Sequence, residues 1–231
     1  MSFTIDGPMA IPMWVNGHAL LTLADEYFML TDPVSGETRY RVPLCGAKEA
    51  AEAVAAARAA QPAWGAMGLM ARRVCLDKLA EALDRYTGHF AKLLRQETGL
   101  DEAAAKAEVE AAVAALREPA VGDTGSVGVV LDASAPVLGF ACVVGAAVLA
   151  GATVVVKPSP KAPSALFALC ELTARADWPA GVVNLLQGDR AALEGLCAAG
   201  VDRVLYRGEA ALGEQVAAAA RAAGVECVTV V

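Results

Sequence analysis

The clearest structural signal in the sequence is the stretch ATVVVKPSPKAPSALFALCELTARADWPAGVVNLLQGD, which runs from Ala152 to Asp189. A run of β-branched residues ends in Lys157-Pro158-Ser159, a helical segment follows, and a second apolar run ends at Gly188. A strand, a helix and a second strand in this order form the repeating unit of parallel sheets. Lys157 is therefore expected at the carboxyl end of a buried strand.

The same alternation extends over the second half of the chain. Apolar runs rich in β-branched residues lie at 126–131, 153–158, 182–186, 202–206 and 225–231, and helical segments lie at 137–150, 164–176, 189–199 and 209–223. This order predicts an α/β fold with a Rossmann-like, doubly wound parallel sheet. Ligands of such sheets bind at the carboxyl ends of the strands.

The first half of the chain has a different pattern. Residues 13–44 alternate polar and apolar side chains around two turn signals, which predicts a small antiparallel ribbon. Helical periodicity at 47–60 and 71–95 predicts a helix pair separated by QPAWGAMG, and 101–117 predicts a third helix. We expect one domain over 1–231, with a ribbon (1–46), a helical part (47–118) and the Rossmann-like part (126–231).

Composition excludes several classes of protein. Hydrophobic residues make up 56% and charged residues 19% of the chain, as in globular proteins. The net charge of −7 argues against nucleic-acid binding, which needs clustered Lys and Arg. The longest apolar stretch, 133–156, contains a proline and several glycines, and no basic segment precedes the apolar residues at the N-terminus. We therefore expect no membrane span and no signal peptide, and a cytoplasmic location.

The cysteines and histidines show no metal-binding spacing. The six cysteines have neither CxxC nor CxxH spacing, and the two histidines have no partner at ligand distance in the sequence. We expect buried, reduced thiols and no metal site. Cys45 is the one cysteine expected in a loop, but no His or Lys is placed beside it to activate a nucleophile.

Six segments, taken in order, resemble one known family. They are residues 15–43, 53–83, LLRQETG (93–99), VLAGATVVVKPSP (148–160), PAGVVNLLQGD (179–189) and VDRVLYRGEAALGEQVAAAA (201–220). Together they resemble the N-terminal, coenzyme-binding half of the aldehyde dehydrogenase superfamily. The resemblance implies NAD or NADP as cofactor, with Lys157 on the adenine-ribose hydroxyls and Gly188 and Gly208 where the backbone approaches the dinucleotide. The implied cofactor-binding residues are Lys157, Pro158, Ser159, Gly188, Gly208, Glu209, Leu212 and Ser134.

The sequence also departs from this family. Ser134 stands where the family has the asparagine of its oxyanion hole, and Pro160 stands where many members have an acidic ribose ligand. Glu209 replaces the serine of a Thr-Gly-Ser turn that receives a cofactor phosphate, and we expect its carboxylate to satisfy the helix end and repel pyrophosphate. Val231 occupies the place of the glutamate base, and the family's nucleophilic cysteine belongs to a later, catalytic domain. We therefore expect no catalytic residues in the chain and weak or absent NAD(P) binding.

Three functions are compatible with these observations. The first is a catalytically incomplete, aldehyde-dehydrogenase-like module that acts in binding or regulation. The second is the NAD(P)-binding subunit of a split aldehyde dehydrogenase, whose partner protein covers the surface left by the missing catalytic domain. The third is an interaction protein that pairs with full-length relatives. The resemblance also implies a homodimer through the helix Glu209–Ala223, whose alanines permit close approach. Only EPAVGDTG (118–125) stands where the family has a strand-exchanging arm, so a tetramer is not expected.

Overall fold

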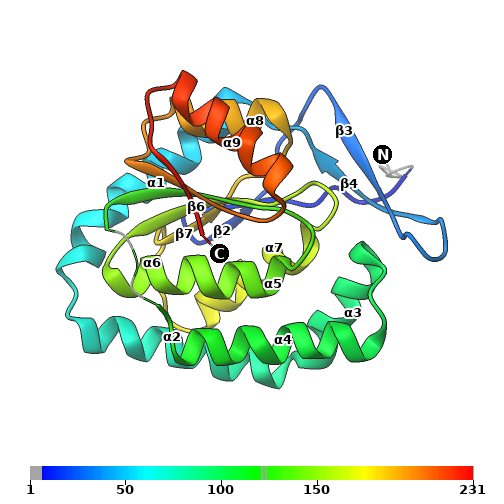
Figure 1. Cartoon of the computed structure of the whole chain (residues 1–231), viewed down its shortest axis with the longest axis horizontal. Helices are drawn as coiled ribbons and strands as arrows, with labels where there is room; N and C mark the ends of the chain where they lie inside the picture. Colours follow the sequence, from blue (N-terminus) through cyan, green and yellow to red (C-terminus); the bar gives the residue numbers. More distant parts are fainter. Residues whose placement is uncertain (1–6, 121, 123, 231) are drawn as a thin grey trace, which may run out of the picture.

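The computed structural model describes residues 7–120, 122 and 124–230, and its centre is a seven-stranded sheet (Figure 1). The strand order is β2-β1-β7-β6-β5-β8-β9. The strands are β1 (Met13–Val15), β2 (His18–Leu20), β5 (Ser126–Leu131), β6 (Thr153–Lys157), β7 (Val183–Leu185), β8 (Arg203–Arg207) and β9 (Cys227–Thr229). A separate two-stranded sheet holds β3 (Tyr27–Thr31) and β4 (Thr38–Pro43).

The five strands from β5 to β9 are parallel, so the doubly wound sheet predicted from the sequence is confirmed. The antiparallel pairing predicted for the N-terminal ribbon is present, but the segment is divided into two hairpins. β1 and β2 join the edge of the main sheet through antiparallel pairing of β1 with β7, while β3 and β4 pair only with each other. Trp14 lies opposite Leu185 in this junction, and this long-range pairing leaves no local trace in the sequence.

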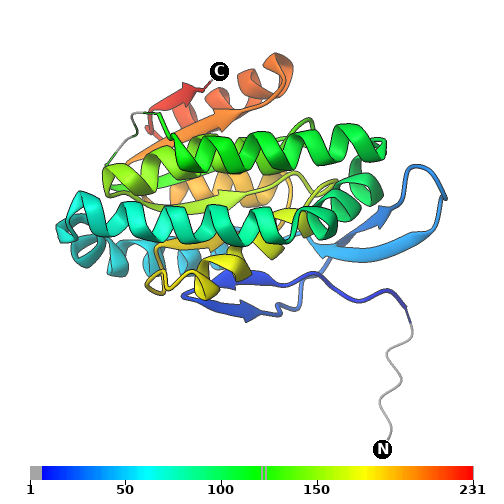
Figure 2. The same cartoon turned by 90° about the horizontal axis from the view of Figure 1, so that it is seen from below.

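Helices cover both faces of the sheet, as Figures 1 and 2 show. α1, α8 and α9 lie on one face, and α2, α4, α5, α6 and α7 lie on the other. The helices are α1 (Ala47–Ala66), α2 (Leu69–Arg85), α3 (Thr87–Thr98), α4 (Glu102–Arg117), α5 (Pro136–Gly139), a π-helical turn (Phe140–Val144), α6 (Gly145–Ala150), α7 (Ser164–Arg175), α8 (Arg190–Ala198) and α9 (Ala210–Ala222). Every helix among the described residues is too short or too polar to cross a bilayer.

The two helical layers explain why the strands read as continuous apolar runs. Val127 and Val129 pack into the core that contains α2, α4 and α7, whereas Val130 packs into the core that contains α1, α8 and α9. Successive side chains of a strand point to opposite faces, and here both faces are buried. All six residues of β5 are accordingly buried.

The helical part differs from the sequence prediction in two places. α1 does not end before QPAWGAMG but continues through Pro62 to Ala66. Trp64 accounts for this continuation, because its side chain is buried, stacks on Trp178 and donates an indole hydrogen bond to the Val148 carbonyl at 3.0 Å. The helix expected over 71–95 is interrupted at Tyr86, where α2 ends and α3 begins.

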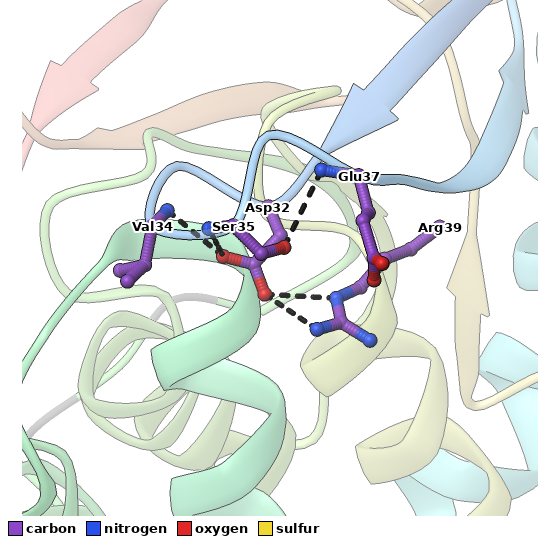
Figure 3. A network of polar contacts seen from close by, with 5 residues as sticks. All are labelled: Asp32, Val34, Ser35, Glu37 and Arg39. Atoms are coloured by element: carbon purple, nitrogen blue, oxygen red, sulfur yellow. Dashed lines mark hydrogen bonds and ion pairs between the residues drawn. The ribbon is translucent and has the colours of Figure 1, made fainter.

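The β3–β4 hairpin projects from the main body (Figure 2), and Asp32 holds its turn together (Figure 3). The Asp32 carboxylate accepts hydrogen bonds from the backbone N–H groups of Val34 and Ser35 at 2.9 and 3.1 Å. It also accepts two from the Arg39 guanidinium at 2.9 and 2.6 Å. The bond from Ser35, followed by those from Arg39 and Val34, holds the pKa of Asp32 below its ordinary value. The hydrogen bonds and the ion pair of this turn therefore depend on an ionised Asp32.

Candidate functional site at the carboxyl edge of the sheet

A cleft of about 830 Å³ lies between α8 and α9, over the carboxyl ends of β5 and β6. Val130 and Leu131 of β5 and Lys157 of β6 form its floor, and the loop after β6 contributes Ser159 and Pro160. α8 and α9 form the walls, mostly with leucine, valine and alanine side chains. The site therefore lies where parallel α/β sheets bind ligands.

Lys157 is the buried charged group of this cleft. Its relative exposure is 5%, and its Nζ donates a hydrogen bond to the carbonyl oxygen of Pro158 at 3.0 Å. Burial lowers the pKa of Lys157 to about 8, and the Asp189 carboxylate acts in the opposite direction. An amine has three potential hydrogen-bond donors when protonated, so Lys157 retains donors for a ligand.

The loop after β6 is anchored by a carboxylate from another layer of the fold. Glu97, at the end of α3, is buried and accepts hydrogen bonds from the backbone N–H groups of Ser164 and Ala165 at 2.7 and 3.4 Å. Burial, only partly offset by these bonds, raises the pKa of Glu97 to about 7. Glu97 thus caps the N-terminus of α7 and fixes the far end of the loop that carries Ser159 and Pro160.

A second buried glutamate caps the helix that follows β5. Glu108 of α4 is buried and accepts hydrogen bonds from the N–H groups of Val137 and Leu138, at 2.9 and 3.3 Å, where α5 begins. Burial raises its pKa above the ordinary value. Neither glutamate was predicted from the sequence. The sequence did contain a signal for both glutamates, because each occupies a core-facing position on an apolar helix face.

Glu209 is the N-cap residue of α9 and is exposed, so its predicted place at a helix N-terminus is confirmed. The expectation that its carboxylate satisfies the helix end was wrong, because its side chain makes no capping hydrogen bond. The backbone is held instead: the Glu209 N–H donates to Asp132 Oδ2, and the Tyr206 hydroxyl donates to the Glu209 carbonyl, both at 2.7 Å. The carboxylate is left as a negative charge beside the helix end.

Asp132 organises the turn that carries Ser134. Its Oδ1 accepts hydrogen bonds from the Ser134 N–H at 2.9 Å and from the Ser134 hydroxyl at 2.6 Å, while Oδ2 accepts from Glu209. The carboxylate therefore connects the ends of β5 and β8. Asp132 was not predicted, because its partner Glu209, at the N-cap of α9, lies in a distant segment of the chain.

Both predicted glycines are also required for a structural reason. A Cβ on Gly208 would lie 2.4 Å from Asp132 Oδ2 and 2.5 Å from the Tyr206 hydroxyl, and a Cβ on Gly188 would lie 2.7 Å from Ala192 Cβ and 3.0 Å from the backbone nitrogen of Cys45. Both glycines also have positive φ, +153° and +125°. Packing alone therefore requires glycine at both positions.

The structure brings together only some of the predicted cofactor-binding residues. Lys157, Ser159 and Leu212 line the cleft. Pro158, Gly188, Gly208, Glu209 and Ser134 are outside its lining, at the strand ends and turns around it. Asp189, Arg190 and Glu194 line it as well and were not predicted; Arg190 and Glu194 form an ion pair at 2.8 Å.

The six cysteines are free thiols, and the predicted burial holds for four of them: Cys45, Cys75, Cys170 and Cys197. Cys45 does lie in a loop, but burial and the nearby Glu49 raise its pKa to about 12. Burial raises the pKa of Cys197 to about 11 and that of Cys170 further. Such thiols are poor nucleophiles because the thiolate is the reactive form. The described residues contain no cluster of three or more metal-binding side chains.

The buried state of Glu97 leads to a pH-dependence prediction. Its folded pKa of about 7 exceeds the ordinary value of 4.5, so the folded protein binds this proton more tightly than the unfolded chain does. The contribution of Glu97 to stability is therefore greatest below pH 4.5 and declines as the pH rises toward 7. Between pH 4.5 and pH 8, the free energy of unfolding of Glu97→Gln, measured in urea, should rise by about 3 kcal/mol relative to that of wild type.

Glu110→Gln serves as the control, because Glu110 is an exposed residue of α4. Its free energy of unfolding should follow that of wild type at both pH values. A Glu97→Gln variant that also follows wild type would show that folding does not raise the pKa of Glu97.

Comparison with known proteins places the chain in a family. The model of the aldehyde dehydrogenase family matches residues 22–122 and 124–230. N-succinylglutamate 5-semialdehyde dehydrogenase of Chromohalobacter salexigens is 31% identical over 226 residues, which cover 87% of this chain and 44% of that protein. The enzyme of the same name from Caulobacter sp. strain K31 is 35% identical over 206 residues, or 79% of this chain and 42% of that protein.

Solved structures agree on the fold. Methylmalonate-semialdehyde dehydrogenase from Oceanimonas doudoroffii superposes with a TM-score of 0.89 at 22% identity, and the match covers 96% of this chain and 50% of that chain. The chain thus spans less than half the length of the curated relatives it matches. The family match, the sequence identities and the sheet topology together establish that the chain belongs to the aldehyde dehydrogenase family and corresponds to its N-terminal, Rossmann-like half.

Proposed function

We propose that the chain is a nucleotide-binding module that takes NAD or NADP weakly and acts in binding or regulation. The observation that carries the proposal is the cleft of about 830 Å³ with the buried Lys157 on its floor. The volume lies within the range of small-molecule and cofactor sites. Lys157 would donate hydrogen bonds to ribose hydroxyls, and the apolar walls from α8 and α9 would receive the adenine.

Two features around the cleft argue for weak binding. Glu209 holds a carboxylate at the N-terminus of α9, where a helix end with free N–H groups would otherwise favour a phosphate. Pro160 lines the cleft where an acidic side chain would accept a hydrogen bond from a ribose hydroxyl. The loss of one charge-assisted bond costs roughly 1.5–3 kcal/mol. We therefore expect dissociation constants for NAD and NADP that exceed about 1 mM.

Calorimetric titration of the purified protein with NAD and with NADP tests this proposal. Wild type should show weak heats that saturate only at millimolar concentrations, and Lys157→Met should abolish them. Lys161→Met, which removes an exposed lysine four positions along the chain, should leave them unchanged. Micromolar binding by wild type, or binding that is insensitive to the Lys157 change, would contradict the proposal.

A second candidate function is the NAD(P)-binding subunit of an aldehyde-oxidising enzyme whose remaining parts come from another polypeptide. The retained Lys157-Pro158-Ser159 segment and the cleft beside it favour this function. A partner protein would then bring the nucleophile and the base, and co-purification of the two chains with NAD-dependent activity would support it. Activity of the 231-residue chain alone would contradict both candidates.

We also propose that the chain forms a homodimer through α9. The half-buried Ala217 and the exposed Ala210 and Glu214 are outside the lining of the cleft, so this side of the helix is available to a second copy. Short alanine side chains allow two helices to approach closely, and a two-fold axis needs only one self-complementary patch.

Light scattering should therefore give the mass of a dimer for wild type. Ala217→Arg should give a monomer, because a long charged side chain would separate the two helices. Ala174→Arg, the same change at an exposed position of α7, should leave the dimer intact. A wild-type monomer or tetramer would count against the interface.

A further inference from the structure

The buried amine of Lys157 has a chemical capacity that nucleotide binding does not use. Among the described residues that line the cleft, Lys157 is the one lysine. Its relative exposure is 5%, and its hydrogen bond to the adjacent Pro158 carbonyl occupies a single donor. Because Lys157 lies in a cleft, a ligand loses its hydration shell before it contacts the amine.

The surroundings of the amine favour its neutral, nucleophilic form. Val130, Leu193, Leu212, Val216 and Ala219 contribute apolar side chains to the cleft. Desolvation disfavours the ammonium ion, and the pKa of Lys157 is lowered to about 8 for this reason. Lysines in apolar pockets are activated for attack on carbonyl carbons in this way.

We propose that Lys157 condenses with aldehydes that enter the cleft and forms an imine with them. The nitrogen lone pair attacks the carbonyl carbon, the π electrons of the C=O bond move to the oxygen, and one of the two amine protons passes to this oxygen to give a carbinolamine. The hydroxyl group then takes up the second amine proton and leaves as water with the electrons of the C–O bond, while a second bond forms between nitrogen and carbon. No electrons are gained or lost overall, so no oxidant or reductant is needed.

The ligand class follows from the cleft. An aldehyde is uncharged and can place a short hydrocarbon body against the apolar walls, whereas a charged electrophile would have to be desolvated there. Asp189 lines the cleft and acts electrostatically on Lys157, so its carboxylate is the nearby group that can accept the proton from the carbinolamine nitrogen. The proposal goes beyond nucleotide binding and does not depend on it.

Reductive trapping on the whole protein tests the proposal. The folded protein is incubated with butanal and cyanoborohydride at pH 7.5, and the alkylated lysines are located by mass spectrometry. An amine with a pKa of about 8 is roughly one-quarter neutral at this pH, whereas an ordinary lysine at 10.5 is neutral in roughly one molecule in a thousand. Since burial slows access, we expect Lys157 to react at least about tenfold faster than the exposed Lys161 and Lys92.

Two controls identify the cleft as the cause. Ala219→Trp should fill the cleft and lower the labelling of Lys157 about tenfold without affecting Lys161, whereas Ala174→Trp on α7 should change neither. In concentrated urea, wild-type Lys157 should be labelled no faster than Lys161. This test does not require any variant to fold. Labelling of Lys157 no faster than that of Lys161 in the folded protein, or an advantage that persists in urea, would overturn the proposal. Calorimetry with NAD decides the nucleotide proposal separately.

Discussion

Glu209→Ser is expected to tighten the binding of NAD or NADP by at least tenfold. The wild-type carboxylate stands at the N-cap of α9, without a capping bond of its own, where a cofactor phosphate would lie near the helix end. Two negative charges about 4 Å apart repel by about 1 kcal/mol in water and about 4 kcal/mol at an effective dielectric constant near 20. Each ~1.4 kcal/mol changes the affinity tenfold. Titration calorimetry of wild type and variant measures the change.

Glu110→Ser is the matched control for this change. Glu110 is an exposed residue of α4, on the opposite face of the sheet from α9, so its removal alters the net charge equally but not the charge at the N-terminus of α9. Its affinity for NAD should remain that of wild type. If both variants tighten binding alike, the net charge and not the position of Glu209 limits the affinity.

Gly208→Ala is expected to destabilise the protein by about 3 kcal/mol or more. A Cβ at this position would lie 2.4 Å from the Asp132 carboxylate and 2.5 Å from the Tyr206 hydroxyl, so the contacts that hold Glu209 would have to separate. For a chain of this size, each kcal/mol lowers Tm by roughly 2–4 °C. Thermal unfolding should therefore show a decrease of roughly 6–12 °C.

Gly224→Ala distinguishes the free-energy cost of the steric clash from the cost of backbone strain. Gly224 also has positive φ, +70°, but no atom lies within 4 Å of the position of its missing Cβ. This variant should cost only about 1–2 kcal/mol, the penalty of a left-handed alanine. A Gly208→Ala protein as stable as Gly224→Ala would mean that Asp132 and Tyr206 can move aside without cost.

The parallel sheet and the position of Lys157 could be predicted from the sequence because their signals are local. β5 and β6 are buried on both faces, so they appear as valine-rich apolar runs, and the charged residues that follow these valines, Asp132 and Lys157, mark the carboxyl ends. The addition of β1 to β7 could not be predicted in this way. It depends on a pairing of Trp14 with Leu185 across most of the chain.

The remaining differences arise from tertiary contacts that override local preferences. Pro62 and Gly65 resemble helix breakers, but the buried indole of Trp64 extends α1 past them. Glu97 and Asp132 were missed for the same reason, since each acts through backbone N–H groups of a distant segment. The position of Glu209 at the helix end could be predicted from the sequence. That its carboxylate makes no capping hydrogen bond is visible only in the structure.

A crystal structure of Glu209→Ser soaked with NAD tests most directly whether the cleft is a nucleotide site, because this variant is expected to bind more tightly than wild type. We expect nucleotide density between α8 and α9, with a ribose hydroxyl within hydrogen-bond distance of Lys157 Nζ. A cleft without nucleotide at saturating NAD, or nucleotide bound elsewhere on the molecule, would contradict it.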